Sequence, residues 1–275
     1  MGYKYSLAHL TVLGCAPPEM IYIANMAGYD HVSIRPIHMG LPGEPNYALA
    51  EKPEMLEQTK RAIAETGVTV HDIELARVHG DMNLADYEPA MAIGAELGAK
   101  HIISSVWTTD KDYYTEQFAK LCDLAAKYGL TVGLEFVPFA GLTNLAAAKE
   151  LIKTVNRPNV THMIDTLHFS RSRVGLEELD DIPAEQLQFA HICDGPAEIP
   201  ALDDRDALIH TARDARFYVG EGGIDIAGII GKLPRDIVLN IELPHLKRVA
   251  EYGYAEHARR CLVKAKEYFA EHGLA

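Results

Sequence analysis

The chain has 275 residues, of which 48% are hydrophobic and 24% are charged, enough to bury a sizeable core. Its formal net charge is -13. Binding to a phosphate backbone needs clustered Lys and Arg, so this charge argues against nucleic acid as a partner. No stretch approaches the roughly 18 apolar residues that span a bilayer, and the first residues do not resemble a secretory leader. We therefore expect a cytoplasmic protein with no membrane partner.

Strand-like runs alternate with helical patterns along the whole chain, which is typical of repeated βα units and a parallel sheet. The predicted strands are Tyr5–Leu10, His31–Arg35, Val68–Leu75, His101–Val106, Thr131–Phe136, Thr161–Asp165, Phe189–Cys193 and Ile237–Leu243. The predicted helices are Pro17–Gly28, Pro53–Thr66, Ala85–Leu97, Lys111–Tyr128, Leu145–Val155, Leu176–Leu179, Ile226–Leu233 and Ala255–His272. Three of these helices are followed closely by a glycine that can take the left-handed conformation at a helix end. These glycines are Gly67, Gly98 and Gly129.

Eight such units in this length predict an α/β fold, a single (β/α)8 barrel that spans residues 1–275 as one domain. An open doubly wound sheet is the alternative, although no G-x-G-x-x-G follows the first strand. Two long segments follow predicted strand ends, Pro36–Lys52 and Asp194–Ile224. Barrel enzymes place their substrate loops at this end of the strands, so we expect the binding site there.

Four strands in the second half of the chain end on a residue that can bind a divalent metal: Glu135, Asp165, His191 and Glu242. A buried carboxylate is costly to desolvate unless a cation or a hydrogen-bond network stabilises it. Any one of these residues alone could be a cap or an ion-pair partner. The ends of strands in a closed barrel converge, however, so the four together predict a shared metal site.

Residues two apart on a strand share a face, and this alternation tests the metal site. The position of Glu135 places Gly133 inside the barrel and Leu134 against the helices. In the same way, Glu242 places Asn240 inside and Ile241 outside. Both strands therefore direct their bulky aliphatic side chains toward the helix layer and their glutamate toward the mouth of the barrel.

Three carboxylates and one imidazole form an oxygen-rich set of ligands, which favours Mn²⁺, with Mg²⁺ or Co²⁺ as alternatives, over a structural zinc site. The four cysteines form no C-x-x-C pair, so we expect reduced thiols. They are Cys15, Cys122, Cys193 and Cys261. A metal with open positions could chelate a carbonyl and an adjacent hydroxyl of a substrate. Proton transfer next to a carbonyl, by way of an enediolate, is the reaction this chemistry favours.

Four segments that contain these residues resemble the strand-five to strand-eight motifs of the xylose isomerase-like barrels. The segments are Gly133-Leu-Glu-Phe, Asp165-Thr-Leu-His, His191-Ile-Cys-Asp and Ile241-Glu-Leu-Pro. The resemblance implies a carbohydrate-like small-molecule substrate, and since barrels of this type are often dimers or tetramers, it also implies a homo-oligomer. In the ketose 3-epimerases of this family, the residues that match Glu135 and Glu242 bind the metal and exchange protons on opposite faces of the substrate. The resemblance therefore implies that both are catalytic here.

Three positions depart from the best-known members of this family. A second glutamate of the epimerases is replaced by Gly141, and their arginine after the strand-seven histidine is replaced by Ala197. The histidine of the dehydroshikimate dehydratases is replaced by Val137. The chain instead resembles a subgroup described as sugar phosphate isomerases/epimerases, a description that does not establish a phosphorylated substrate.

Six residues are candidates for contact with the substrate. His168 lies three residues after Asp165, where the family places a substrate contact. Three arginines lie on loops expected to overhang the site and could bind a carboxylate or phosphate. These arginines are Arg171, Arg213 and Arg216. His9 and Glu74 are near the ends of the first and third strands.

Four functions are weighed against the sequence. The first is a metal-dependent isomerase or epimerase of a keto-sugar or related polyol. The second is a dehydratase or lyase that acts on a cyclic ketone, such as an inosose, dehydroshikimate or a 3-keto-glycoside. The third is a DNA-repair endonuclease, which the acidic chain disfavours because it needs a basic groove. The fourth is a barrel that binds sugar without catalysis.

Overall fold

The computed structural model describes residues 2–40 and 44–274, so part of the segment Pro36–Lys52 lies outside the described residues. Eight parallel strands follow one another around a closed barrel, and β1 pairs with β8. The strands are β1 Lys4–Ala8, β2 His31–Ile34, β3 Thr69–Val78, β4 His101–Val106, β5 Thr131–Glu135, β6 Val160–Asp165, β7 Leu187–Ile192 and β8 Val238–Ile241. The predicted barrel is confirmed, and the open doubly wound sheet is excluded.

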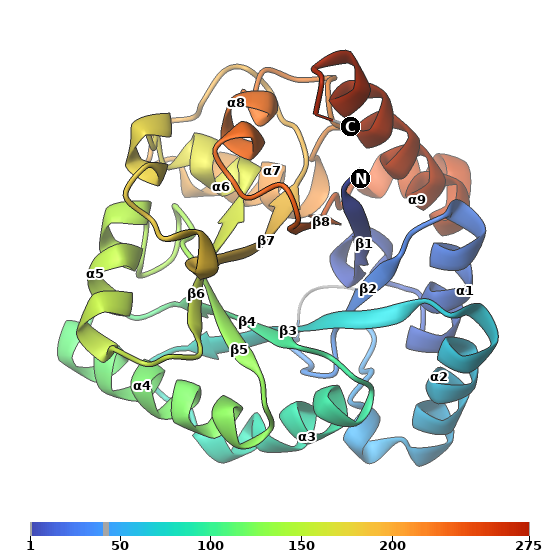
Figure 1. The fold of residues 1–275 in the computed structure, drawn as a ribbon, viewed down its shortest axis with the longest axis horizontal. Helices are drawn as coiled ribbons and strands as arrows, with labels where there is room; N and C mark the ends of the chain where they lie inside the picture. The colour runs from blue at the N-terminus through green and yellow to red at the C-terminus, as the bar shows by residue number, and fades with distance from the viewer. Residues whose placement is uncertain (1, 41–43, 275) are drawn as a thin grey trace.

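Helices surround the strands on all sides of the barrel (Figure 1). They are α1 Pro17–Ala27, α2 Pro53–Thr66, α3 Glu88–Glu96, α4 Lys111–Lys127, α5 Leu145–Val155, α6 Thr166–Arg171, α7 Arg205–Asp214, α8 Ile226–Gly231 and α9 Leu246–Glu271. Gly67 has φ 75° and Gly129 has φ 67°, so the left-handed positions predicted after these helices are confirmed. No helix among the described residues is long and apolar enough to cross a membrane.

Two apolar layers hold the barrel together. The larger one lies between the strands and the helices. The smaller one fills the interior of the barrel with Leu75, Ile103, Met163 and Phe189. A Cβ on Gly133 would lie 3.2 Å from Phe189 Cζ, so this glycine faces the interior, as the alternation along β5 predicted. The position has no room for a larger side chain because the Phe189 ring occupies it.

Histidine rings pack against one another, tilted, at the end of the barrel where the strands begin. The His71 and His101 ring centroids are 4.7 Å apart, and His101 lies 5.1 Å from the Phe189 ring. Burial lowers the pKa of His101 to about 4, so this ring is neutral at physiological pH and packs as an aromatic side chain. His31 also begins its strand at this end, as expected for a structural residue.

Several predicted boundaries were wrong, and each has a local cause. The helix after β6 is α6, which begins directly after Asp165, whereas Leu176–Leu179 forms a short 3-10 turn. The segment Asp194–Ile224, predicted as a loop, contains α7. The last helix starts at Leu246, well before Ala255, because a kink at Gly253 with φ 74° joins two helical pieces.

Strand β1 ends at Ala8, before the predicted Leu10, and the chain turns into a 3-10 helix over His9–Val12. The hydroxyl of Thr11 donates to the Ile241 carbonyl at 2.8 Å and accepts from the Leu243 backbone N–H at 2.8 Å. These bonds tie the turn to the end of β8, so the chain leaves the sheet early.

We predict that Phe189→Ala lowers the free energy of unfolding by about 3 to 5 kcal/mol, because a large ring is removed from a closed interior that cannot collapse. Leu202→Ala is the control, since Leu202 is 52% exposed and should change stability by less than about 0.5 kcal/mol. Urea unfolding of both variants measures the difference. Equal stability of the two variants would contradict this account of the interior.

Candidate metal centre

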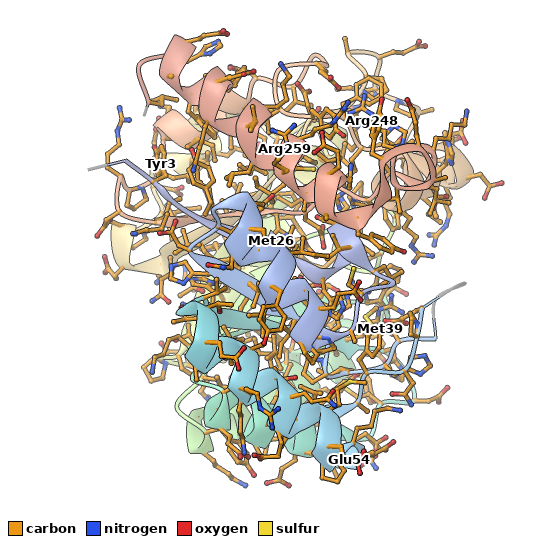
Figure 2. All side chains as sticks on the ribbon, turned by 90° about the vertical axis from the view of Figure 1, so that its right-hand side faces the viewer. Tyr3, Met26, Met39, Glu54, Arg248 and Arg259 are labelled. Atoms are coloured by element: carbon orange, nitrogen blue, oxygen red, sulfur yellow. The ribbon has the colours of Figure 1, made fainter. Side chains whose placement is uncertain are left out.

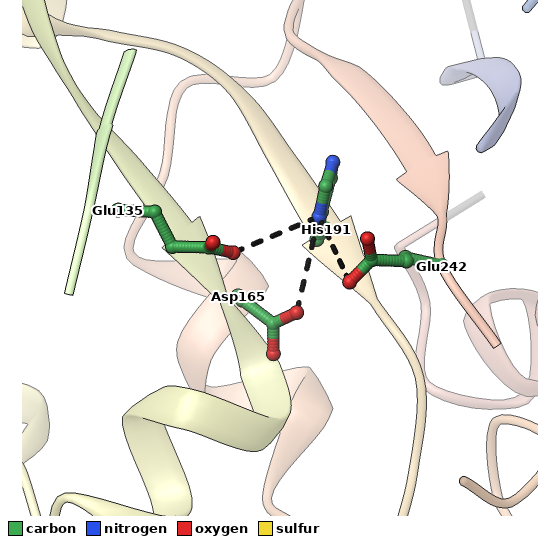
Figure 3. Close-up of side chains that lie close together, drawn as sticks. All are labelled: Glu135, Asp165, His191 and Glu242. Atoms are coloured by element: carbon green, nitrogen blue, oxygen red, sulfur yellow. Dashed lines mark ion pairs between the residues drawn. The ribbon is translucent and has the colours of Figure 1, made fainter. Parts of the chain in front are cut away.

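The four predicted ligands meet at the end of the barrel where the strands finish. Glu135 and Asp165 are the last residues of β5 and β6, His191 is the next to last of β7, and Glu242 follows β8. One donor atom from each lies within 4.8 Å of all the others (Figure 3). The barrel thus brings together residues that are up to 107 positions apart in the chain (242 − 135).

His191 lies at the centre of the cluster. Its Nδ1 is 3.4 Å from Glu242 Oε2 and 3.9 Å from both Glu135 Oε1 and Asp165 Oδ2. All four residues are at most 7% exposed. Three carboxylates this close in a dry site repel one another and favour a cation between them.

The other ring nitrogen of His191 is held by Asn240, which the alternation along β8 had placed inside the barrel. The Asn240 amide lies 3.0 Å from Nε2, and its Oδ1 has no partner among the described residues. The two ends of an amide are interchangeable in such a structure. With its oxygen turned to the ring, the amide accepts from Nε2–H and leaves the Nδ1 lone pair facing the carboxylates, which is the tautomer that metal binding needs.

Two buried atoms in the cluster have no hydrogen-bond partner within the described ranges, Glu135 Oε1 and His191 Nδ1. Buried polar atoms without a partner are rare, and a bound ion is one explanation for them. Both atoms point toward the centre of the cluster (Figure 3). The donor set of three carboxylates and one imidazole therefore fits a divalent metal ion.

Arg216 is bound to the protein's own carboxylates, which differs from its predicted place on a loop above the substrate. Its Nη1 lies 2.7 Å from Asp165 Oδ2, and its Nη2 lies 2.7 Å from Glu242 Oε2. The Nε atom donates to the Ala212 carbonyl at 2.9 Å. This fork fixes two of the ligands relative to each other and offsets part of their charge.

The two glutamates are in opposite electrostatic environments. Burial opposes ionisation of Glu242, but Arg216 and His191 outweigh it and hold the pKa of this carboxyl well below its usual range. Burial raises the pKa of Glu135 well above its usual value, and the carboxylates of Glu242 and Asp165 raise it further. Two carboxyl groups with divergent pKa values are typical of an acid and base pair.

Asp194 organises the segment that carries Arg216, a role that sequence reasoning missed. Its buried carboxylate accepts four backbone N–H groups at 2.8 to 3.1 Å. The donors are Gly195, Gly220, Gly222 and Ile224. Its backbone also pairs with Phe217, the neighbour of Arg216. This carboxylate therefore stabilises the long loop in the conformation that delivers the arginine.

The cluster opens into a cavity of about 60 Å³, and three of the predicted substrate residues line it, His168, Arg213 and Arg216. Trp107 and Phe139 form an aromatic wall whose ring centroids are 6.0 Å apart. His168 stacks edge-on against Phe139, and burial lowers its pKa to about 4. This neutral imidazole is available as a hydrogen-bond partner for a substrate. The aromatic wall was not predicted, because Trp107 and Phe139 follow strands without any motif.

Two other predicted substrate residues, His9 and Arg171, form hydrogen bonds within the protein. His9 Nδ1 accepts from the Arg35 backbone N–H at 3.0 Å, so Nε2 carries the proton and donates to the Cys15 carbonyl at 2.8 Å. Arg171 donates to the Pro196 carbonyl at 2.8 Å. Neither residue lines the cavity at the cluster, so the structure does not bring them to the position that the sequence suggested.

Glu74 lies beside the cluster and belongs to a buried network. Ser33 Oγ hydrogen-bonds to Asp72 Oδ2 and lies 2.8 Å from Glu74 Oε1. Burial and the carboxylate of Glu242 raise the pKa of Glu74, while the positive charge of Arg35 opposes this shift. The other oxygen of Glu74 accepts from Arg35 Nε at 2.9 Å.

The described cysteines are all free and buried. Burial raises the pKa of the Cys193 thiol to about 12, although Arg216 lies 3.3 Å from its sulfur. A thiol with such a pKa is not a nucleophile at neutral pH.

We predict that metal affinity rises with pH, because the ion must displace a proton from His191. Burial alone would lower the pKa of this imidazole, but Glu242 and Glu135 outweigh burial and raise it to about 10. Below that pH the ring is protonated, so affinity for Mn²⁺ should increase about tenfold per pH unit for each proton released. Titration calorimetry in two buffers of different ionisation enthalpy, from about pH 6.5 to 8.5, counts the protons. Metal binding without proton release would contradict the pKa of His191.

We predict that Asp194→Asn lowers the free energy of unfolding by about 2 to 3 kcal/mol, since an amide NH₂ would face backbone N–H donors and the charge would be lost. Asp203→Asn, at an exposed position in the same segment, is the matched control. Urea denaturation compares the two variants, and equal midpoints would show that the four N–H bonds do not stabilise the loop.

Comparison with known proteins places this site in a family. A family model described as "Xylose isomerase-like TIM barrel" matches residues 21–265. An inosose isomerase from Bacillus subtilis (strain 168) is 25% identical over 205 residues, which cover 68% of this chain and 70% of that protein.

Two solved structures share the fold. The structure of the IOLI protein with a bound zinc atom has a TM-score of 0.80 at 18% identity, covering 98% of this chain and 99% of that chain. A D-allulose 3-epimerase from Methylomonas sp. in complex with D-allulose has a TM-score of 0.69 at 16% identity, covering 98% and 99%. Since the family match extends over nearly all of the barrel, the chain belongs to the xylose isomerase-like TIM barrel family.

Proposed function

We propose that this protein is a divalent-metal-dependent isomerase or epimerase that transfers a proton next to the carbonyl group of a keto-sugar or related polyol. One observation carries the proposal: Glu135 and Glu242 approach His191 from opposite sides (Figure 3). A proton removed from one face of a carbon and returned to the other needs a group on each side. The names of the relatives, an inosose isomerase and an allulose epimerase, support a small sugar-like substrate.

Glu135, Asp165, His191 and Glu242 would hold the metal ion. When bound, a divalent ion polarises a carbonyl oxygen and so acidifies the neighbouring C–H group. The oxygen-rich donor set favours Mn²⁺, with Mg²⁺ or Co²⁺ as alternatives. The zinc in the similar IOLI structure makes zinc a further candidate for metal analysis.

The protein's own groups would position the substrate and move the proton. The Glu242 carboxylate, kept ionised by Arg216, would take the proton from the carbon next to the carbonyl. Glu135, on the other side, would return a proton from its carboxyl group. The aromatic wall of Trp107 and Phe139 would cover the sugar ring and exclude water. In the opposite direction the two glutamates exchange roles.

Solvent deuterium tests the reaction class. The purified protein, loaded with the metal found by elemental analysis, is incubated in D₂O with a set of keto-sugars and inososes. One deuterium should enter the carbon beside the carbonyl, with no net loss of water. Formation of an enone absorbance would instead assign the protein as a dehydratase. A complete lack of exchange together with tight sugar binding would assign it as a sugar-binding barrel.

We predict that Glu135→Gln and Glu242→Gln each reduce turnover by about 10²- to 10⁴-fold, the usual contribution of a general acid or base. Metal affinity should also fall, by about 10- to 100-fold, because a ligand that can ionise is replaced by a neutral amide. Glu54→Gln is the control, since Glu54 lies exposed on the outer side of α2 (Figure 2). Circular dichroism checks that the fold is intact, and full activity of metal-stripped wild-type protein would refute the mechanism.

A further inference from the structure

We propose that the substrate is an anion, and that Arg77 and Arg213 bind its carboxylate or phosphate group beside the metal centre. This inference rests on the proposed function in one respect, because it assumes that the substrate binds in the same cavity. It adds a substrate class, an acidic sugar or sugar phosphate, that the names of the relatives do not contain.

Four arginines line the cavity that contains Glu135 and Glu242, and they fall into two groups. Arg216 is paired with Asp165 and Glu242 at 2.7 Å. Arg35 is also paired with buried glutamates: its Nε lies 2.9 Å from Glu74 Oε2, and its Nη1 lies 3.5 Å from Glu44 Oε1. The charges of these two arginines are therefore balanced by the protein.

Arg77 and Arg213 make no ion pair with a carboxylate in the part of the chain that the structure describes. Both side chains are half-buried. Burial, together with the positive charges of Arg213 and Arg35, lowers the pKa of Arg77 to about 10. Like charges brought together without a counter-ion are a strained arrangement that a bound anion would relieve.

The guanidinium of Arg77 is held in place before any ligand arrives. Its Cζ lies 4.6 Å from the centroid of the Trp107 ring, a cation–π contact that holds the charge over the ring. Its Nε is buried and has no hydrogen-bond partner among the described residues. A planar guanidinium with an unused buried donor suits a two-point contact with a carboxylate or a phosphate.

The charge of the whole chain opposes the binding of anions. The net charge is -13, so the general field of the protein repels anions. An anionic substrate would need a local positive site at the entrance to the cavity. Arg213 lies in the last turn of α7 and Arg77 near the end of β3, so two unrelated elements contribute to one positive site.

The space around Arg77 suits a substrate larger than one polar group. Arg77, Leu75 and Met39 line both the cavity at the metal centre and a neighbouring cleft of about 670 Å³. An anionic group bound at Arg77 would therefore lie where the two spaces meet. The carbonyl end would face Glu135 and Glu242, and any further part of the substrate would extend into the cleft.

Binding of three matched sugars tests the proposal on the metal-loaded protein. The probes are fructose, fructose 6-phosphate and 5-keto-gluconate, which share a keto group and differ in charge. We expect one anionic probe to bind at least about tenfold tighter than fructose in calorimetry at low salt, with affinity falling as salt rises. Preference for fructose 6-phosphate identifies a phosphate site, and preference for 5-keto-gluconate a carboxylate site. Equal affinity for all three probes would overturn the proposal.

The Arg variants locate the site. Arg77→Gln and Arg213→Gln should each weaken binding of the preferred anion by about tenfold or more, and should weaken fructose binding much less. Arg205→Gln is the matched control, because Arg205 is exposed at the start of the same helix as Arg213. The conservative Arg213→Lys should retain part of the affinity. If the double variant keeps the full preference for the anion, the two arginines are not its site.

A metal-independent measurement separates this proposal from the proposed function. Inorganic phosphate is titrated into EDTA-treated protein, where the metal cannot attract it. Binding that is present in wild type and lost in the Arg77→Gln/Arg213→Gln double variant supports the anion site, even if no sugar exchanges deuterium. Deuterium exchange into neutral sugars alone, without any phosphate binding, would support the proposed function and refute the anion site.

Discussion

The convergence of strand ends in a closed barrel is the constraint on which the rest of this structure depends. It places three carboxylates and one imidazole within 4.8 Å of one another in a buried position, where mutual repulsion is only weakly screened. The protein can keep this arrangement only by supplying positive charge. Arg216 supplies part of it from outside the cluster, and a divalent ion in the centre would supply the remainder.

Arg216 neutralises some of the ligand carboxylates more than others, so the two glutamates of the site differ in their pKa values. The arginine contacts Asp165 and Glu242 and forms no ion pair with Glu135 among the described residues. Arg216 and His191 lower the pKa of Glu242 against the effect of burial, whereas burial and the carboxylates of Glu242 and Asp165 raise the pKa of Glu135. Two chemically identical side chains thus acquire opposite tendencies to hold a proton. The position of the arginine depends in turn on Asp194, whose carboxylate orders the surrounding loop. A loop residue outside the cavity therefore affects the acid and base chemistry that we propose.

Features that depend on strand periodicity could be predicted from the sequence. Few features that depend on the structure of the loops could be predicted. Alternation along β5 and β8 correctly placed Gly133 and Asn240 inside the barrel, because a strand has a fixed repeat. Arg216 was predicted to contact substrate, since nothing in the local sequence reveals that it folds back onto Asp165. Contacts of this kind join residues 51 positions apart and depend on the whole segment between β7 and β8, including helix α7, which the sequence pattern did not predict.

The charged groups near the mouth of the barrel fall into two sets. The charges in the interior are paired with opposite charges of the protein, whereas the charges of two arginines at the rim are unpaired among the described residues. In the interior, Ser33 hydrogen-bonds to the buried carboxyl groups of Asp72 and Glu74, and Arg35 pairs with Glu74 at 2.9 Å. The charge of Arg35, like that of Arg216, is therefore paired with carboxylates of the protein itself. Arg77 and Arg213 on the rim form no ion pair with a carboxylate in the ranges that the structure describes, so their charge is available to a ligand. A neutral sugar would leave that charge without a counter-ion, which is why the charge balance of the cavity favours an acidic substrate.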